Sequence, residues 1–212
     1  MANKYYTTLP APMDFIALDF ETANHQRESV CEMGIAVVEN SLITESRSWL
    51  VRPRHNWFHA MNTRIHGIDA QRVANEPEFD RVWEEAKNYF ENANLIAHNA
   101  SFDIGVLRRV LVQYDLALPT LTYSCSLAVA RRAWKGLPSY GLKSLASRFN
   151  IPLNHHSAEP DAIASAEILL RATKEHQIER FSDISQTFGL HLGKLSSEDT
   201  GPSQLRTYNR RI

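Results

Sequence analysis

Residues 13 to 51 carry the hydrophobic patterns of strands, with no helical pattern between them. Phe15–Phe20 is an apolar run interrupted only by one acidic residue, which is typical of a strand buried on both faces. In Val30–Val38 apolar side chains recur at every second position, and Glu39–Ser41 reads as a turn into a third strand at Leu42–Val51. The three segments together predict an antiparallel meander.

After Pro77 the pattern changes to helices that alternate with strands. Apolar side chains recur every three or four positions from Phe79 to Phe90, and again from Ile104 to Leu111. Three strands followed by a β-α-β-α order predict an α/β fold, a mixed five-stranded sheet with helices on both faces. The other predicted elements are strands at Leu95–Ala97 and Leu121–Cys125 and helices at Ser126–Trp134, Gly141–Phe149 and Pro160–Thr173.

The 212 residues suit one domain with a modest extension. We place the domain at residues 13–175, because the regular patterns fade after about residue 176. Residues 176–212 form a partly irregular C-terminal extension of unknown role, in which Phe181–Leu190 is a short amphipathic segment and Ser196–Pro202 a linker. The chain ends in a basic stretch that is typical of disordered tails.

The formal net charge of −1 excludes a protein that grips duplex nucleic acid through many phosphates. Hydrophobic content of 43% and charged content of 22% are ordinary for a soluble globular protein. The two cysteines, Cys31 and Cys125, are far apart and predict free thiols in a reducing compartment. We find no run able to span a membrane and no leader pattern, and therefore expect a cytoplasmic protein without a membrane partner.

Four acidic residues each lie beside an apolar segment that is expected to be buried. They are Asp19, Glu21, Asp103 and Asp161, and His156 stands five positions before the last of them. Burying carboxylates without compensation is costly, so a cation is expected among them. Carboxylate oxygens are the ligands that Mg²⁺ and Mn²⁺ prefer, which predicts a site for one of these metals.

The predicted elements bring these side chains together. Asp19 and Glu21 are two residues apart on one strand and therefore point to the same face, near the strand's C-terminal end. Asp103 falls in the first turn of a helix, and Asp161 opens another helix directly after Pro160, which suits the first helical position. A simpler interpretation is that Asp103 and Asp161 complement helix dipoles. That interpretation accounts for neither the pair on the strand nor the histidine.

These residues resemble the motifs of the DEDDh 3′→5′ exonucleases, a family that includes the proofreading subunit of bacterial replicative DNA polymerase. The first motif is DFET at Asp19–Thr22, the second HNASFD at His98–Asp103, and the third H-x4-D at His156–Asp161. The resemblance covers residues 13 to 175 and implies a ribonuclease H-like fold. A sister class has a tyrosine four residues before the last aspartate, where this chain has Ser157.

The resemblance implies a catalytic site with two Mg²⁺ or Mn²⁺ ions. Asp19 would bridge both ions, Glu21 and Asp161 would complete the site on the nucleophile's side, and Asp103 would hold the ion at the leaving group. His156 would take the proton from the attacking water, releasing a nucleoside 5′-monophosphate. The neighbouring His155 lies outside the motif spacing, and we expect it to be a solvated loop residue.

Substrate contacts are expected around the same motifs. Thr22 follows the carboxylate pair and is placed to bond the terminal nucleotide, while His66, in the segment RIHGI, matches a family segment near the terminal base. Phe102 is placed to stack on a base. The alternatives stay open that Phe102 belongs to the core and that Asn99 or Ser101 caps the following helix. The substrate-binding candidates are Thr22, His66, His98, Asn99 and Phe102.

The sequence therefore predicts a metal-dependent 3′→5′ exonuclease for single-stranded or frayed 3′ ends of nucleic acid, with DNA favoured. An RNA-trimming 3′→5′ exoribonuclease is the enzymatic alternative. An alternative of a different class is a binding module that docks on a polymerase or a sliding clamp. Gln204–Tyr208, QLRTY, distantly resembles clamp-binding peptides, but it lacks the usual hydrophobic residue before the aromatic one.

Overall fold

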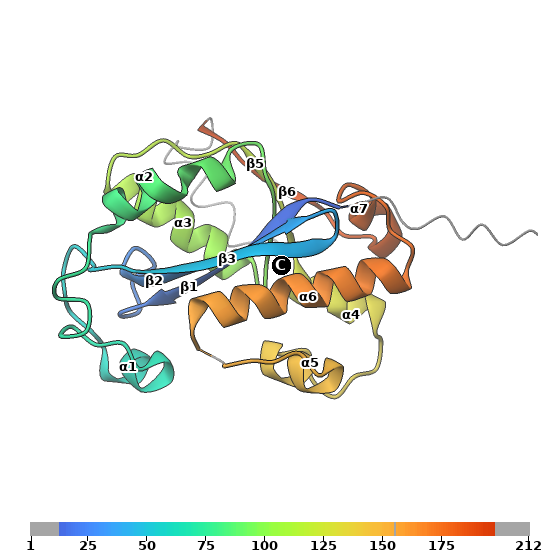
Figure 1. Ribbon diagram of the computed structural model, residues 1–212, viewed down its shortest axis with the longest axis horizontal. Helices are drawn as coiled ribbons and strands as arrows, with labels where there is room; N and C mark the ends of the chain where they lie inside the picture. The colour runs from blue at the N-terminus through green and yellow to red at the C-terminus, as the bar shows by residue number, and fades with distance from the viewer. Residues whose placement is uncertain (1–12, 155, 198–212) are drawn as a thin grey trace, which may run out of the picture.

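The structure is a computed structural model that describes residues 13–154 and 156–197. Within these residues, six strands form one sheet with the order β3-β2-β1-β4-β5-β6 (Figure 1). β1, β2 and β3 pair antiparallel, β4 and β5 run parallel to β1, and β6 pairs antiparallel with β5. The strands are β1 Phe15–Thr22, β2 Val30–Glu39, β3 Leu42–Leu50, β4 Asn94–Ala97, β5 Leu121–Cys125 and β6 Gly193–Leu195.

Helices cover both faces of the sheet, so the predicted mixed α/β architecture is confirmed. Figure 1 shows α2 and α3 above the sheet and α4, α5 and α6 below it. Leu18 and Phe20 of β1 pack in the core beneath α2 and α3, whereas Phe15 and Ala17 pack in the core against α4 and α6. The helices are α1 Ala60–His66, α2 Phe79–Phe90, α3 Ser101–Gln113, α4 Ser126–Ala133, α5 Leu142–Phe149, α6 Ala158–Glu175 and α7 Asp183–Phe188.

The turn between β2 and β3 lies where the sequence predicts it. Asn40 and Ser41 have positive φ angles of 53° and 62°, the left-handed conformation that tight two-residue hairpin turns use. The pairing of Glu39 with Leu42 closes this hairpin. Because β1 is bonded to β2 on one side and to β4 on the other, the strand with the carboxylate pair lies in the interior of the sheet.

The sheet has one strand more than the five predicted, because the C-terminal extension contributes β6. Leu195 of β6 is fully buried and pairs with Leu121 of β5. The extension also supplies α7, within the predicted amphipathic segment, and Phe181, whose ring centroid lies 6.3 Å from that of Phe15. The first part of the extension therefore packs on the domain core. The division at residue 175 stays a prediction, and the tail after residue 197 lies outside the described residues.

Two helices differ from the sequence prediction. α6 begins at Ala158 with Ser157 at its N-cap position, so Pro160 is the third helical residue and not the first. α1 was not predicted, because it has no buried residue and therefore no apolar stripe facing a core. Both helices border the end of β1 that carries the carboxylates, as the contacts below show.

Two further expectations concern the thiols and the membrane. Cys31 is buried, Cys125 is half-buried, and both are free thiols, as the sequence predicts. Within residues 13–154 and 156–197, no helix combines the length and the apolar character needed to cross a bilayer.

Candidate active site

Asp19 and Glu21 lie side by side on one face of β1, at its C-terminal end. Their positions on the strand alternate with the buried Leu18 and Phe20, so both carboxylates face the layer that contains α6. Across the antiparallel pairing, Asp19 stands opposite Gly34 and Glu21 opposite Glu32 of β2. The pairing shifts by one residue directly after Glu21, where the regular ladder ends.

Asp103 reaches the same strand from the first turn of α3. Its side chain is 2% exposed, and its Oδ1 accepts a hydrogen bond of 3.2 Å from the backbone N–H of Phe20. That N–H lies between the two carboxylates of β1 in sequence. The contact spans 83 residues of chain, and it fixes the start of α3 against the end of β1.

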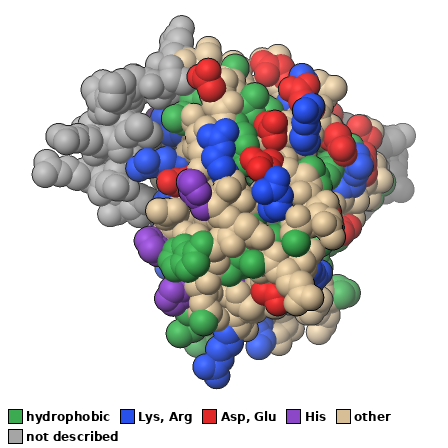
Figure 2. All heavy atoms as spheres, turned by 90° about the vertical axis from the view of Figure 1, so that its left-hand side faces the viewer, with side chains coloured by type: hydrophobic (Ala, Val, Ile, Leu, Met, Phe, Trp, Pro, Cys, Tyr) green, Lys and Arg blue, Asp and Glu red, His purple; other side chains and the backbone are tan. Residues whose placement is uncertain are grey.

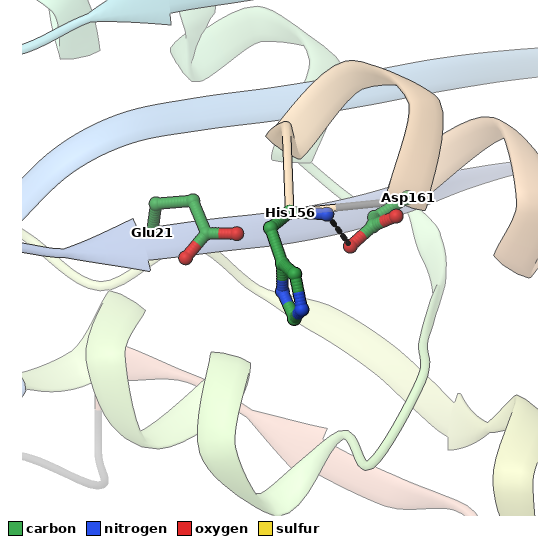
Figure 3. Close-up of side chains that lie close together, drawn as sticks. All are labelled: Glu21, His156 and Asp161. Atoms are coloured by element: carbon green, nitrogen blue, oxygen red, sulfur yellow. Dashed lines mark hydrogen bonds between the residues drawn. The ribbon is translucent and has the colours of Figure 1, made fainter. Parts of the chain in front are cut away.

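Asp161 and His156 come from the start of α6 and the turn before it (Figure 3). Asp161 is 3% exposed, and its Oδ2 accepts a hydrogen bond of 3.2 Å from the backbone N–H of His156. His156 has a positive φ of 70°, so the chain turns sharply there. Ligand atoms of Glu21, His156 and Asp161 all lie within 4.8 Å of one another. The predicted pairing of His156 with Asp161 is therefore present as a compact group with Glu21.

A close approach of β2 to α6 sets the position of this group. A Cβ on Gly34 would overlap the backbone of Ala158 and Glu159, so only glycine permits the observed packing. Next to it, Glu32 accepts a hydrogen bond of 3.0 Å from the backbone N–H of Ala158 and so caps α6. Glu32 is 6% exposed and belongs to none of the predicted motifs. The sequence signal that could have indicated Glu32 is its position two residues before Gly34, on a predicted strand next to the one with the carboxylate pair.

Burial and mutual repulsion disfavour the ionised form of these carboxyl groups. Desolvation, followed by the charge of Asp103, raises the pKa of Asp19 well above its ordinary value. Desolvation and the charge of Asp161 raise the pKa of Glu21 to about 8. Desolvation raises the pKa of Asp103 to about 8, although the backbone N–H of Phe20 opposes the shift. Such a cluster of oxygen donors is what a hard divalent cation compensates.

Thr22 and His66 are joined at the end of β1. Thr22 is buried, and its carbonyl oxygen lies 3.2 Å from His66 Nε2 and accepts a 2.9 Å hydrogen bond from Asn62 Nδ2. His66 Nδ1 accepts from the backbone N–H of Ile68, so Nε2 carries the proton and donates to Thr22. Burial lowers the pKa of His66. Thr22 and His66, both predicted to contact the substrate, therefore lie at the end of β1 that carries Glu21.

The second predicted motif surrounds Asp103. His98 is half-buried, and its ring nitrogens lie 2.9 Å from Ser126 Oγ and 3.1 Å from the carbonyl oxygen of Tyr140. Asn99 is exposed, with a positive φ of 67°. The N-cap of α3 is Ala100, and it makes no side-chain capping bond, so neither predicted capping residue occupies that position. A substrate contact by His98 or Asn99 stays a prediction.

Phe102 is partly buried and packs against the core, with Arg27 over its ring. The guanidinium carbon of Arg27 lies 5.6 Å from the ring centroid, and its Nη1 donates to the carbonyl oxygens of Ser101 at 2.7 Å and Phe102 at 3.3 Å. A Cβ on Gly105 would overlap this guanidinium. Arg27, which belongs to none of the predicted motifs, thus joins the loop after β1 to the start of α3.

The sequence matches the protein family described as Exonuclease over residues 16–169, which include all four carboxylates and His156. The chain therefore belongs to this family of RNase T/DnaQ-like exonucleases, and the predicted family and enzyme class are confirmed. Exonuclease X, in a structure with 5′ overhanging duplex DNA, aligns with a TM-score of 0.64 and 26% identity, covering 80% of this chain and 98% of that chain. This likeness confirms the ribonuclease H-like fold.

Two curated relatives show how the chain relates to longer proteins. The PolC-type DNA polymerase III of Caldanaerobacter subterraneus subsp. tengcongensis is 28% identical over 167 residues, which are 77% of this chain and 12% of that protein. The 3′-5′ exonuclease DinG of Bacillus subtilis is 28% identical over 160 residues, which are 74% of this chain and 17% of that protein. The chain thus spans less than a fifth of the length of either relative.

Proposed function

We propose that this protein is a divalent-metal-dependent 3′→5′ exonuclease that removes mononucleotides from single-stranded or frayed 3′ ends of DNA. The observation that supports the proposal is the meeting of four buried or half-buried carboxylates with His156 at the end of β1. One relative is named a 3′-5′ exonuclease, which supports the proposed activity, and another is named a DNA polymerase, which favours DNA as the substrate. Such an activity suits DNA replication or repair.

The donor set fits Mg²⁺ or Mn²⁺. All four carboxylates offer oxygen, the ligand atom these hard ions prefer, and a bound cation would counter the burial that raises the pKa of Glu21 and Asp103. Asp19, Glu21 and Asp161 would hold an ion on the side of the attacking water, and Asp103, with Asp19, would hold an ion on the side of the leaving group. Bound ions would supply positive charge that stabilises the phosphate as negative charge develops on its oxygens.

His156 is proposed as the general base. Its imidazole lies with Glu21 and Asp161, so a water held among these groups is within reach of a ring nitrogen. The imidazole accepts the proton as the water oxygen bonds to the phosphorus. The bond from phosphorus to the 3′ oxygen of the preceding nucleotide breaks, that oxygen takes a proton from solvent, and the nucleoside 5′-monophosphate is released. The hydrogen bond from the His156 backbone N–H to Asp161 fixes the position of the base relative to this carboxylate.

The terminal nucleotide is proposed to lie at the end of β1, between α1 and the start of α3. Thr22 and His66 border the site from the side of α1, and Phe102 borders it from the start of α3 with Arg27 behind its ring. Asn99, exposed directly before α3, faces solvent where it can contact a phosphate or sugar. His98, also a predicted substrate contact, lies between α4 and Tyr140, with its ring nitrogens near Ser126 Oγ and the Tyr140 carbonyl oxygen.

The proposal includes a polymerase or sliding clamp as a partner only through the kinship with PolC-type polymerases. The candidate peptide Gln204–Tyr208 lies outside the described residues. A cytoplasmic location likewise stays a prediction.

The test is a digestion of oligonucleotides labelled at the 5′ end with Mg²⁺, with Mn²⁺ and with EDTA. We expect a ladder that shortens one nucleotide at a time, nucleoside 5′-monophosphates as products, and no reaction with EDTA. Parallel DNA and RNA strands of one sequence decide between the proposed substrate and the exoribonuclease alternative. Cutting of a circular single strand without any dependence on ends would refute the proposal, and an inactive protein that binds a clamp would favour the docking module.

A further inference from the structure

An exposed apolar surface lies beside the active site. Five large hydrophobic side chains among the described residues are strongly exposed, and three of them, Trp57, Met61 and Ile65, fall within nine positions of the chain. Met61 and Ile65 are four residues apart on α1 and share one side of that helix. Figure 2, which faces the end of the molecule that contains α1, shows hydrophobic side chains next to histidines. Concentrated apolar exposure of this kind marks interaction surfaces.

Trp57 stands at the centre of a group of three aromatic rings. Its ring centroid lies 6.0 Å from that of His25 and 6.3 Å from that of His59, with interplanar angles of 79° and 80°. The backbone beneath is tied down, because Asn24 Nδ2 donates to the Trp57 carbonyl oxygen at 3.0 Å. Trp57 is nevertheless 51% exposed. The indole is thus held in place while half of its surface remains available to a ligand.

Two hydrogen bonds attach this surface to the chain that directly follows the catalytic Glu21. The backbone N–H of His59 donates to the Ala23 carbonyl oxygen at 2.9 Å, and Asn62 donates to Thr22. Residues 22 to 24 directly follow Glu21 on the chain. A pocket of about 330 Å³ lies between α1 and the turn before α6, and it is lined by Ile65 and His66 of α1 and by His156 of the active site. Of the three exposed apolar side chains, Ile65 therefore borders the same pocket as the proposed general base.

Positive charge accompanies this pocket although the whole chain has a net charge of −1. Arg64 and Arg72 both line the pocket and are both exposed. Exposed aromatic rings together with exposed arginines are the combination that single-strand-binding surfaces use, since the rings stack on bases of any sequence and the cations contact phosphates. An apolar peptide would use the rings but would leave the two arginines without a partner in the complex. The pattern therefore favours a nucleic-acid strand.

We propose that Trp57, supported by His25 and His59, is a stacking platform for bases upstream of the 3′-terminal nucleotide, with Arg64 and Arg72 on the phosphates. The inference rests on the proposed function, because it assigns the surface to the same substrate strand. It also sets the polarity of the strand, whose 3′ end lies at the carboxylates and whose body passes over α1. Binding should therefore strengthen as the strand grows long enough to reach Trp57.

The test compares the wild type with Trp57→Ala on substrates of increasing length. The p-nitrophenyl ester of thymidine 5′-monophosphate presents one nucleoside, a dinucleotide presents two, and an octanucleotide extends over α1. We expect the ratio of the KM values, variant over wild type, to grow along this series and to reach roughly 5- to 150-fold for the octanucleotide, the usual value of one base–aromatic stack. Equal losses on the ester and the octanucleotide would assign Trp57 a merely structural role and overturn the platform.

Two matched variants sharpen the comparison. Trp57→Phe keeps a ring and should recover most of the octanucleotide affinity. Leu42→Ala is the control, because it removes another strongly exposed apolar side chain, 68% exposed, at the start of β3. Leu42 pairs with Glu39, at the end of β2 away from Glu32, so the KM values of this variant should match those of the wild type.

A binding measurement separates this inference from the proposed function. Fluorescence anisotropy of a labelled octanucleotide in EDTA or Ca²⁺ requires no hydrolysis. A wild type that hydrolyses none of the three substrates would refute the proposed function, while a Kd weakened by Trp57→Ala would still support the platform. An unchanged Kd for Trp57→Ala would overturn the platform whether or not the wild type is active.

Discussion

Gly34→Ala tests whether the contact of β2 with α6 positions the catalytic group. The added methyl would lie against the carbonyl group of Ala158 and the backbone nitrogen of Glu159, roughly 1 Å or more inside the carbon contact distance of about 3.5 Å. Backbone atoms of a helix start cannot rotate away as a flexible side chain can. The first turn of α6 must therefore retreat by about 1 Å, which stretches the hydrogen bond from the Ala158 N–H to Glu32.

Two quantities follow from that retreat. Overpacking costs about 1–3 kcal/mol, and weakening the cap adds about 1 kcal/mol, so the free energy of unfolding should fall by roughly 2–4 kcal/mol. Asp161 and His156 move with the helix start, and a misplacement of about 1 Å can cost about 100-fold in kcat. Urea unfolding measures the first quantity, and single-turnover digestion of an oligonucleotide measures the second on protein that remains folded.

Gly141→Ala is the matched control. Gly141 has a negative φ of −62°, and a Cβ there would meet only Ser139 Oγ at 3.8 Å, an ordinary contact distance. The gain from a stiffer unfolded chain should roughly offset the weaker N-cap of α5, leaving stability within about 0.5 kcal/mol of wild type. If Gly34→Ala behaved like Gly141→Ala in both stability and kcat, the proposed positioning of α6 by β2 would be wrong.

Three further predictions follow from the charges of the site. Burial raises the pKa of Glu21 and Asp103 to about 8, from ordinary values of 4.5 and 3.8. The protons that these two groups retain stabilise the metal-free fold, fully below about pH 4, and this stability is lost as pH rises through about 8. The Tm in EDTA should therefore fall between these pH values, and Mg²⁺ should make the fall smaller. Asp19→Asn should raise Tm in EDTA by roughly 2–4 °C for each kcal/mol of repulsion relieved, while abolishing the Mg²⁺-dependent gain; an unchanged Tm in both buffers would contradict this. His156→Ala should lower kcat by roughly 10²–10⁴-fold while metal binding persists, with His155→Ala within a few-fold of wild type, and a larger loss at His155 would reverse the assignment.

The elements that sequence periodicity predicts well are those with one face in a core. β5 matches its predicted bounds, and α2 matches its apolar stripe from Phe79 to Phe90, because each buries a continuous row of side chains. The candidate site was predictable for a related reason. Asp19, Glu21 and Asp103 interrupt such buried rows, and charge at buried positions is rare unless a function requires it.

The missed features depend on contacts between distant parts of the chain. β6 has three residues, Gly193–Leu195, too few for a period-2 pattern, and is defined only by its pairing with β5. The early start of α6 depends on Glu32, which caps Ala158 from 126 positions away. α1 buries no residue and is held by polar contacts to the end of β1, which leave no hydrophobic signal. Local propensity contains no information about such partners.

The most direct test of the central claim is anomalous diffraction from crystals grown with Mn²⁺ and a 3′-ended oligonucleotide carrying a phosphorothioate at its last linkage. The account predicts anomalous peaks among Asp19, Glu21, Asp103 and Asp161, with the last phosphate against them, His156 facing its attacked side and the strand continuing over α1 toward Trp57. Peaks that avoid these carboxylates in crystals of demonstrably active protein would contradict the account, as would a strand bound with its 5′ end at the site.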